Sequence, residues 1–227
     1  MSKPFRTVGL IGLAVIAVSL SLLFVFPKEA GTLPTGFTTP ILAFEFVQTP
    51  QEAQALFDSP SIDQQTLLTA MNRGNRLDYI YLILYPLFLL TFSLKAAQLT
   101  GRKMLYAPAA LAVLLSIADA LENVQLLRIA NKLAGGDFSA ELSALHLFTW
   151  LKWGSIATTS LLLAIGYFWQ GKLFSKVIAL GGVIAFALAI GAFLNRSILN
   201  EYFAQSVAVM FVLLIVYSFL FKSAENG

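Results

Sequence analysis

Cysteine is absent from the 227-residue chain, and histidine occurs only once, at His146. The lack of cysteine excludes disulfides, thiolate nucleophiles and cysteine metal sites, and one histidine cannot build a three-histidine zinc centre. We therefore expect neither a metal site nor a cofactor. Charged residues are also scarce, at 12% against roughly 25% in soluble domains. The formal net charge is +3, and the lysines and arginines form no dense cluster in the sequence, so no nucleic-acid partner is expected.

Hydrophobic residues are abundant instead, at 58% of the chain, and the mean hydropathy is +0.77. A water-soluble fold could not bury this much apolar surface, so the lipid bilayer is the expected solvent and partner. A helix needs about 20 apolar residues to cross the hydrocarbon. The sequence predicts an all-α, polytopic membrane protein, one integral membrane domain over residues 1–227. Its six predicted spans lie at about 8–26, 77–97, 104–126, 145–169, 175–194 and 203–221.

The first apolar run follows Lys3 and Arg6, an arrangement that a signal peptide shares. The run of about 19 residues is longer than the roughly 7–15 residues of a signal-peptide core, and no small-x-small cleavage pattern follows it. We interpret it as a retained first transmembrane helix, with a cleaved signal peptide as the alternative.

The distribution of lysine and arginine favours one orientation. With the N-terminus in the cytoplasm, the cytoplasmic segments carry eight of these residues and the opposite segments six. By the positive-inside rule, both termini are expected in the cytoplasm. Residues 27–76 then form an outer, periplasmic segment.

This outer segment is expected to contain two short helices outside the membrane. Thr49-Pro50-Gln51-Glu52 has the form of a capping box with proline at the first helical position, which predicts a helix to about Phe57. A second box at Ser61 predicts another helix, to about Arg73, that Gly74 ends. Their apolar residues need burial, so we expect the helices to lie on the membrane surface or over the bundle mouth as a lid. A simple spacer is the alternative.

Ionisable residues inside the apolar runs are the most informative feature of the sequence. Such a group costs at least about 2.5–3.5 kcal/mol at the centre of a membrane helix, and is usually paired or functional. Helical spacing places several polar residues on shared faces of the second, third and fourth spans. The predicted topology places all of them in the outer half of the membrane. The residues of this predicted binding site are Asp78, Tyr81, Tyr85, Asp119, Glu122, Asn123 and Lys152.

The expected arrangement is a polar cavity that opens outward between these three spans. An unpaired buried charge is costly, so Lys152 is expected to pair with Asp119 or Asp78. One remaining carboxylate would then be available as an acid, a base or a ligand. The alternatives are an interhelical clamp without any ligand, and a path for protons or ions.

The same residues resemble a family of small bacterial multi-pass membrane proteins that has no assigned activity. The resemblance covers roughly residues 41–168, and Asp-x-x-Glu-Asn is its most specific element. It rests on Phe44-Glu45-Phe46 with Thr49, Glu52 and Ala53, on Leu77-Asp78-Tyr79-Ile80-Tyr81 with Tyr85, on Asp119-Ala120-Leu121-Glu122-Asn123, and on Lys152-Trp153. The resemblance implies that these polar positions are the family's signature and that the chain lies in the inner (plasma) membrane of a bacterium. It supplies no mechanism.

Three functional hypotheses follow. The first is a protein that binds or transports a polar or amphipathic, lipid-like ligand, such as a lipid or small amphiphile, in the outward-facing cavity. The second is an intramembrane enzyme that uses Asp119 or Glu122 for acid–base chemistry on a lipid-like substrate. The third is an assembly subunit whose polar cluster only joins helices. The sequence identifies no catalytic residue and no oligomeric state, and it lacks the motifs of intramembrane zinc hydrolases and rhomboid-type proteases.

Overall fold

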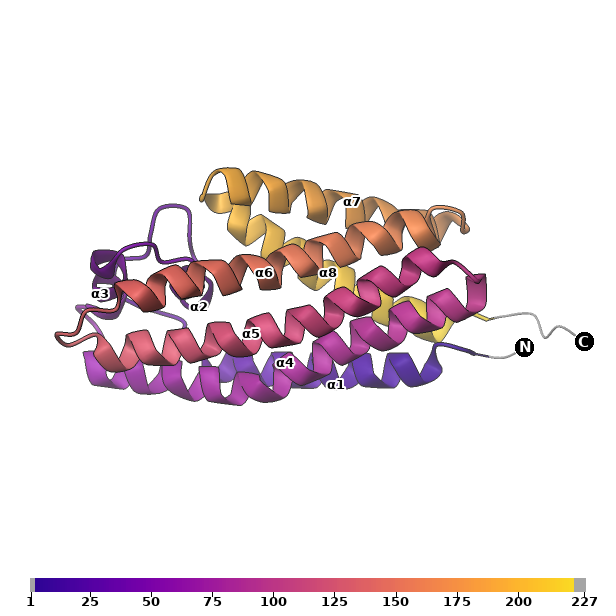
Figure 1. Ribbon diagram of the computed structural model, residues 1–227. Helices are drawn as coiled ribbons and strands as arrows, with labels where there is room; N and C mark the ends of the chain where they lie inside the picture. The colour runs from indigo at the N-terminus through magenta and orange to yellow at the C-terminus, as the bar shows by residue number, and fades with distance from the viewer. Residues whose placement is uncertain (1–2, 223–227) are drawn as a thin grey trace, which may run out of the picture.

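A computed structural model describes residues 3–222, and these residues fold entirely into helices and loops. Six helices are long (Figure 1): α1 (Arg6–Val25), α4 (Gln64–Thr100), α5 (Tyr106–Lys132), α6 (Ser139–Leu163), α7 (Leu173–Leu194) and α8 (Ile198–Leu220). The short elements are α2 (Pro40–Glu45), α3 (Pro50–Phe57), the 3₁₀ turn η1 (Lys103–Leu105) and the π-helical turn η2 (Ala164–Phe168) that continues α6. The all-α prediction is confirmed.

Five of the helices within residues 3–222 are long and apolar enough to cross a membrane: α1, α4, α5 together with η1, α7 and α8. Helix α6 contains most of the fourth predicted span, which η2 continues, but it does not reach the same hydropathy. Its sequence includes His146, Lys152 and several serines and threonines, which lower its average. Composition therefore supports a multi-pass membrane protein, although the most apolar stretch of α6 is less hydrophobic than those of the other five long helices.

The long helices pack as an elongated bundle in which each helix neighbours the next along the chain (Figure 1). The bundle closes because α1 also lies against α8. The start of α1 meets the end of α8: the ring centroids of Phe5 and Phe221 are 5.6 Å apart, and Gly9 lies beneath the ring of Phe219. Helices α2 and α3 lie at the opposite end of the bundle (Figure 1).

The first predicted short helix is present as α3. Its N-cap is Thr49, whose hydroxyl accepts a hydrogen bond from the amide of Glu52 at 3.2 Å, and Pro50 begins the helix. An additional short helix, α2, begins at Pro40, which the sequence analysis did not predict.

The second predicted short helix is wrong as a separate element. It forms the first turns of α4, whose N-cap is Asp63 rather than Ser61 and which passes Gly74 without interruption. Gly74 does not end the helix. It makes room for another chain segment, because a Cβ atom there would collide with the ring of Phe26. The 37 residues of α4 extend about 55 Å at 1.5 Å per residue, so α4 projects well beyond a bilayer core about 30 Å thick.

Residues 27–63, which we term the cap segment, are anchored on one end of the bundle. The carboxylate of Glu201 on α8 accepts hydrogen bonds from the amides of Thr38 and Thr39, both at 2.8 Å. The guanidinium of Arg196 donates to Glu52 at 2.8 Å and to the carbonyl oxygen of Phe46 at 2.9 Å. The cap segment is therefore held against one end of the bundle by hydrogen bonds to α8 and to Arg196.

Two apolar clusters make up the interior, and a polar layer separates them along three helices. On α4 the cap-side cluster ends at Met71 and the bundle cluster begins at Leu82. Helices α5 and α6 show the same division. The polar residues of the intervening layer are Asn75 and Asp78 on α4, Asp119, Glu122 and Asn123 on α5, and Thr149 and Lys152 on α6.

Candidate functional site

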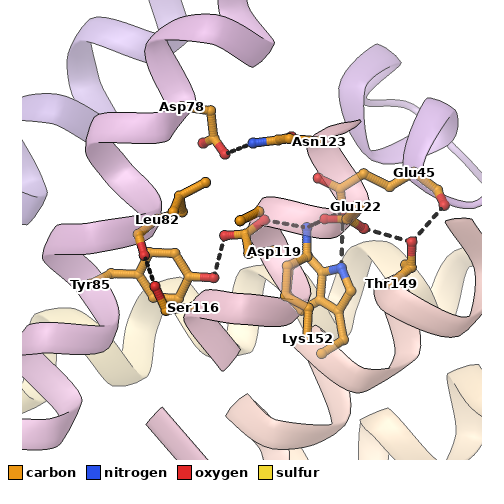
Figure 2. A network of polar contacts seen from close by, with 12 residues as sticks. Glu45, Asp78, Leu82, Tyr85, Ser116, Asp119, Glu122, Asn123, Thr149 and Lys152 are labelled. Atoms are coloured by element: carbon orange, nitrogen blue, oxygen red, sulfur yellow. Dashed lines mark hydrogen bonds and ion pairs between the residues drawn. The ribbon is translucent and has the colours of Figure 1, made fainter. Parts of the chain in front are cut away.

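Lys152 is the centre of the polar layer (Figure 2). Its ammonium group forms ion pairs with Glu122, with Glu45 at 3.0 Å and with Asp119 at 3.6 Å. The Lys152 side chain is only 7% exposed, and that of Glu122 is fully buried. Three carboxyl groups from two helices, α2 and α5, thus surround one ammonium group on a third, α6.

Glu45 is the partner of Lys152 that the sequence analysis did not identify. It is the last residue of α2, and its carboxylate also accepts a hydrogen bond from the indole of Trp153 at 2.9 Å. The hydroxyl of Thr149 donates to Glu122 Oε1 at 2.6 Å and lies 3.1 Å from the carbonyl oxygen of Glu45. The cap segment therefore supplies a charged residue to the interior of the bundle.

Asp119 and Asp78 also contact neutral partners on the facing helix (Figure 2). The hydroxyl of Tyr85 donates to Asp119 Oδ2 at 2.6 Å. The amide of Asn123 donates to Asp78 Oδ2 at 2.7 Å. Both bonds join α4 to α5. Asp119 contacts both Lys152 and Tyr85, whereas Asp78 does not contact Lys152.

The predicted pairing of Lys152 is therefore correct in part. Asp119 is an ion-pair partner, but Glu122 and Glu45 lie closer to the ammonium group. Within residues 3–222, Asp78 forms no ion pair. The i, i+3 spacing put Asp119 and Glu122 on one face of α5, and that face meets Lys152. It could not show that a residue 70 or more positions earlier completes the group.

A cavity of about 560 Å³ adjoins the polar layer. Six of the seven predicted site residues line it; Glu122 lies behind the wall. The polar and charged residues of its lining are Ser19, Lys28, Thr38, Thr39, Glu45, Asn75, Asp78, Tyr81, Tyr85, Asp119, Asn123, Lys152, Glu201 and Gln205. The structure thus brings the predicted residues together around one space, and adds Glu45, Asn75 and Glu201 to them.

The cavity continues between α1 and α8. These helices touch at one end, where Gly12 lies against Ile215. Toward the cap segment both helices line the cavity instead. The lining residues are Leu22 and Leu23 of α1, Phe26 directly after it, and Ala204, Gln205, Val207, Ala208 and Phe211 of α8. Leu23 is 63% exposed, so the apolar side of the cavity reaches the outer surface of the bundle.

A further polar contact, between Glu52 and Arg196, lies outside the apolar spans and outside the lining of the cavity. Glu52 on α3 has a lowered pKa, chiefly because the Arg196 guanidinium hydrogen-bonds to its carboxylate. His146 is exposed on α6 and lines a separate hollow, which Arg196 also lines. Within residues 3–222, no three acidic or histidine side chains are arranged to hold a metal ion.

No protein-family model, no curated protein and no solved structure matches the chain.

Proposed function

We propose that the protein spans a bacterial inner membrane six times and binds or transports an amphipathic, lipid-like ligand. The observation that carries this proposal is the cavity of about 560 Å³, which has a charged wall on one side and an apolar gap between α1 and α8 on the other. Cavities of about 300–1,000 Å³ are the usual size of small-molecule sites. The polar group of the ligand lies at Asp78 and Asp119, and its apolar part lies in the gap.

The polar layer divides into two parts under this proposal. Lys152, Glu122 and Glu45 join α6, α5 and α2, and so act as the interhelical clamp. Asp78 has a single neutral partner and faces the cavity, so it is available to a ligand. The clamp and the pocket are then neighbouring parts of one layer, and the ligand binds beside the clamp.

Orientation is part of the proposal. The cap segment and the cavity lie on the periplasmic side, and both termini lie in the cytoplasm. Two reporter enzymes, one active only in the cytoplasm and one active only in the periplasm, are fused in turn after Gly227, beyond the residues that the structure describes. Only the cytoplasmic reporter is expected to be active. Activity of a periplasmic reporter at that position would contradict the outward-facing cavity.

A cavity-filling variant tests the binding function. Ala208→Phe places a ring in the gap between α1 and α8, whereas Ala187→Phe adds the same ring to an exposed position on α7. Native mass spectrometry of protein extracted from membranes is expected to show a co-purifying amphiphile with the wild type and Ala187→Phe, and a loss of most of it with Ala208→Phe. Equal retention by both variants would show that the amphiphile binds elsewhere.

A further inference from the structure

We propose that the ligand's head group is a cation, a primary or quaternary ammonium group attached to an apolar chain, and that Asp78 binds it. The inference rests on the proposed function, because it names the class of ligand that the same cavity takes. Three features of the lining support it: the balance of acids and bases, an unpartnered amide beside Asp78, and the aromatic faces around them.

Acids outnumber bases on the cavity wall. The lining contains Glu45, Asp78, Asp119 and Glu201 against Lys28 and Lys152. Lys152 already contacts three carboxyl groups, one of which, Glu122, lies outside the lining. Lys28 is exposed and is therefore placed in water rather than against the buried acids.

An anionic head group fits this wall poorly. Its charge would approach Asp78 and Asp119, while the nearest ammonium group is held by other carboxylates. A like charge close to a buried carboxylate is unfavourable, and an opposite charge is favourable. Glu201 does not alter this, because two backbone amides and the hydroxyl of Thr39 already donate to its carboxylate.

Asn75 gives the second, independent observation. It lies one helical turn before Asp78 on α4, is fully buried, and lines the cavity. Neither its side-chain oxygen nor its side-chain nitrogen has a hydrogen-bond partner. A buried polar group without a partner costs about 1–3 kcal/mol, so its position in the wall indicates a partner inside the cavity. Its amide oxygen can accept a hydrogen bond from a primary ammonium group that Asp78 neutralises.

Aromatic side chains complete the site. Tyr81, Tyr85 and Trp153 line the same cavity, and the rings of Tyr81 and Tyr85 are 4.8 Å apart. Ring faces attract cations, including quaternary ammonium groups that cannot donate hydrogen bonds. Asp78, Asn75 and the two tyrosines lie on one stripe of α4, so a head group there can contact charge, amide and ring together.

The test compares three probes with the same 12-carbon chain: dodecylamine, dodecanol and dodecanoate. Each is titrated into the purified protein in dodecyl maltoside micelles, and the rise in unfolding temperature gives the concentration of half-maximal effect. We expect dodecylamine to stabilise the wild type at concentrations at least about tenfold below those of dodecanol, because one charge-assisted contact contributes roughly this factor or more. Dodecanoate is expected to be no better than dodecanol.

Two variants locate the effect, and one controls for charge. Asp78→Asn keeps an oxygen for Asn123 but removes the charge, and is expected to raise the half-maximal dodecylamine concentration at least about tenfold. Asn75→Leu removes an amide that has no partner among the described residues. The variant is expected to fold as well as the wild type and to need more dodecylamine for the half-maximal effect. Asp58→Asn, an exposed change outside the cavity, leaves the titration unchanged.

The outcomes separate this inference from the proposed function. If dodecanoate stabilises the wild type as well as dodecylamine does, or if Asp78→Asn leaves the dodecylamine midpoint in place, the cationic head group is refuted. When all three probes act equally and Ala208→Phe abolishes their effect, the amphiphile cavity stands and only its charge preference falls. If no probe stabilises the wild type, both the inference and the proposed function fail.

Discussion

Replacing Lys152 by methionine is expected to destabilise the protein far more than replacing Asp78 by asparagine. Lys152→Met leaves Glu45, Glu122 and Asp119 together without a counter-charge. At an effective dielectric constant of about 20, one pair at the 3.0 Å distance of Lys152 and Glu45 attracts by roughly 5 kcal/mol, and desolvation offsets much of this. Removing one partner of a buried pair costs about 3–5 kcal/mol, and we expect a loss in that range.

Asp78→Asn is expected to cost less than about 1 kcal/mol, because the new amide oxygen still accepts the hydrogen bond from Asn123 and no ion pair is lost. Lys132→Met is the matched control for Lys152→Met. It removes the exposed pair between Lys132 and Glu141, whose lysine side chain is 45% exposed, and such pairs contribute about 0–1 kcal/mol. Each of the three variants replaces a charged side chain by a neutral one, but the replaced side chains differ in burial and in the number of ion-pair partners.

The measurement is the free energy of unfolding in maltoside micelles, from denaturant titrations followed by circular dichroism. The division of the polar layer into clamp and pocket requires that Lys152→Met differ from both other variants by at least about 2 kcal/mol, the gap between the ranges above. It is refuted if Asp78→Asn loses as much stability as Lys152→Met, or if Lys152→Met stays within 1 kcal/mol of the wild type.

Three further predictions concern the contacts around the site. Tyr85→Phe removes the buried 2.6 Å hydrogen bond to Asp119 and is expected to cost about 1.5–3 kcal/mol in the same titration. Glu52→Gln is expected to cost about 1 kcal/mol or less, because the side chain is partly exposed. Arg196 lowers the Glu52 pKa below its ordinary 4.5. The difference in free energy of unfolding between this variant and the wild type is therefore constant above about pH 4.5, and it shrinks at lower pH as Glu52 is protonated. Gly36→Ala is expected to cost about 1–3 kcal/mol in thermal unfolding, because φ is +91° and the added Cβ would stand 2.5 Å from a backbone nitrogen. Little or no change in any of these would contradict the corresponding contact.

The long helices could be predicted from the sequence because hydropathy acts locally. Each predicted span lies largely within one long helix, and the polar residues on spans two to four were predicted by spacing alone. These residues share a layer because i, i+3 and i+7 positions share a helical face. The long apolar runs therefore predicted the fold class, and the polar residues within them predicted six of the residues that line the cavity.

What the sequence could not supply depends on tertiary contacts. Glu45 reaches Lys152 only because the cap segment folds over the bundle end, and no periodicity relates residues more than 100 positions apart. A signal was present, since Glu45 is the only charged residue between Ile41 and Val47. Gly74 was misinterpreted for a similar reason. The local rule makes glycine a helix end, but here the residue allows Phe26 to approach.

The central claim is that an amphiphile occupies the cavity with its head group at Asp78. An experimental structure of the protein in lipid nanodiscs, prepared without added ligand, tests this most directly. We expect elongated density between α1 and α8, beginning within hydrogen-bond distance of Asp78 and Asn75. A cavity closed by contact between Leu23 and Ala208, with the Asn75 amide bonded to the protein itself, would contradict it.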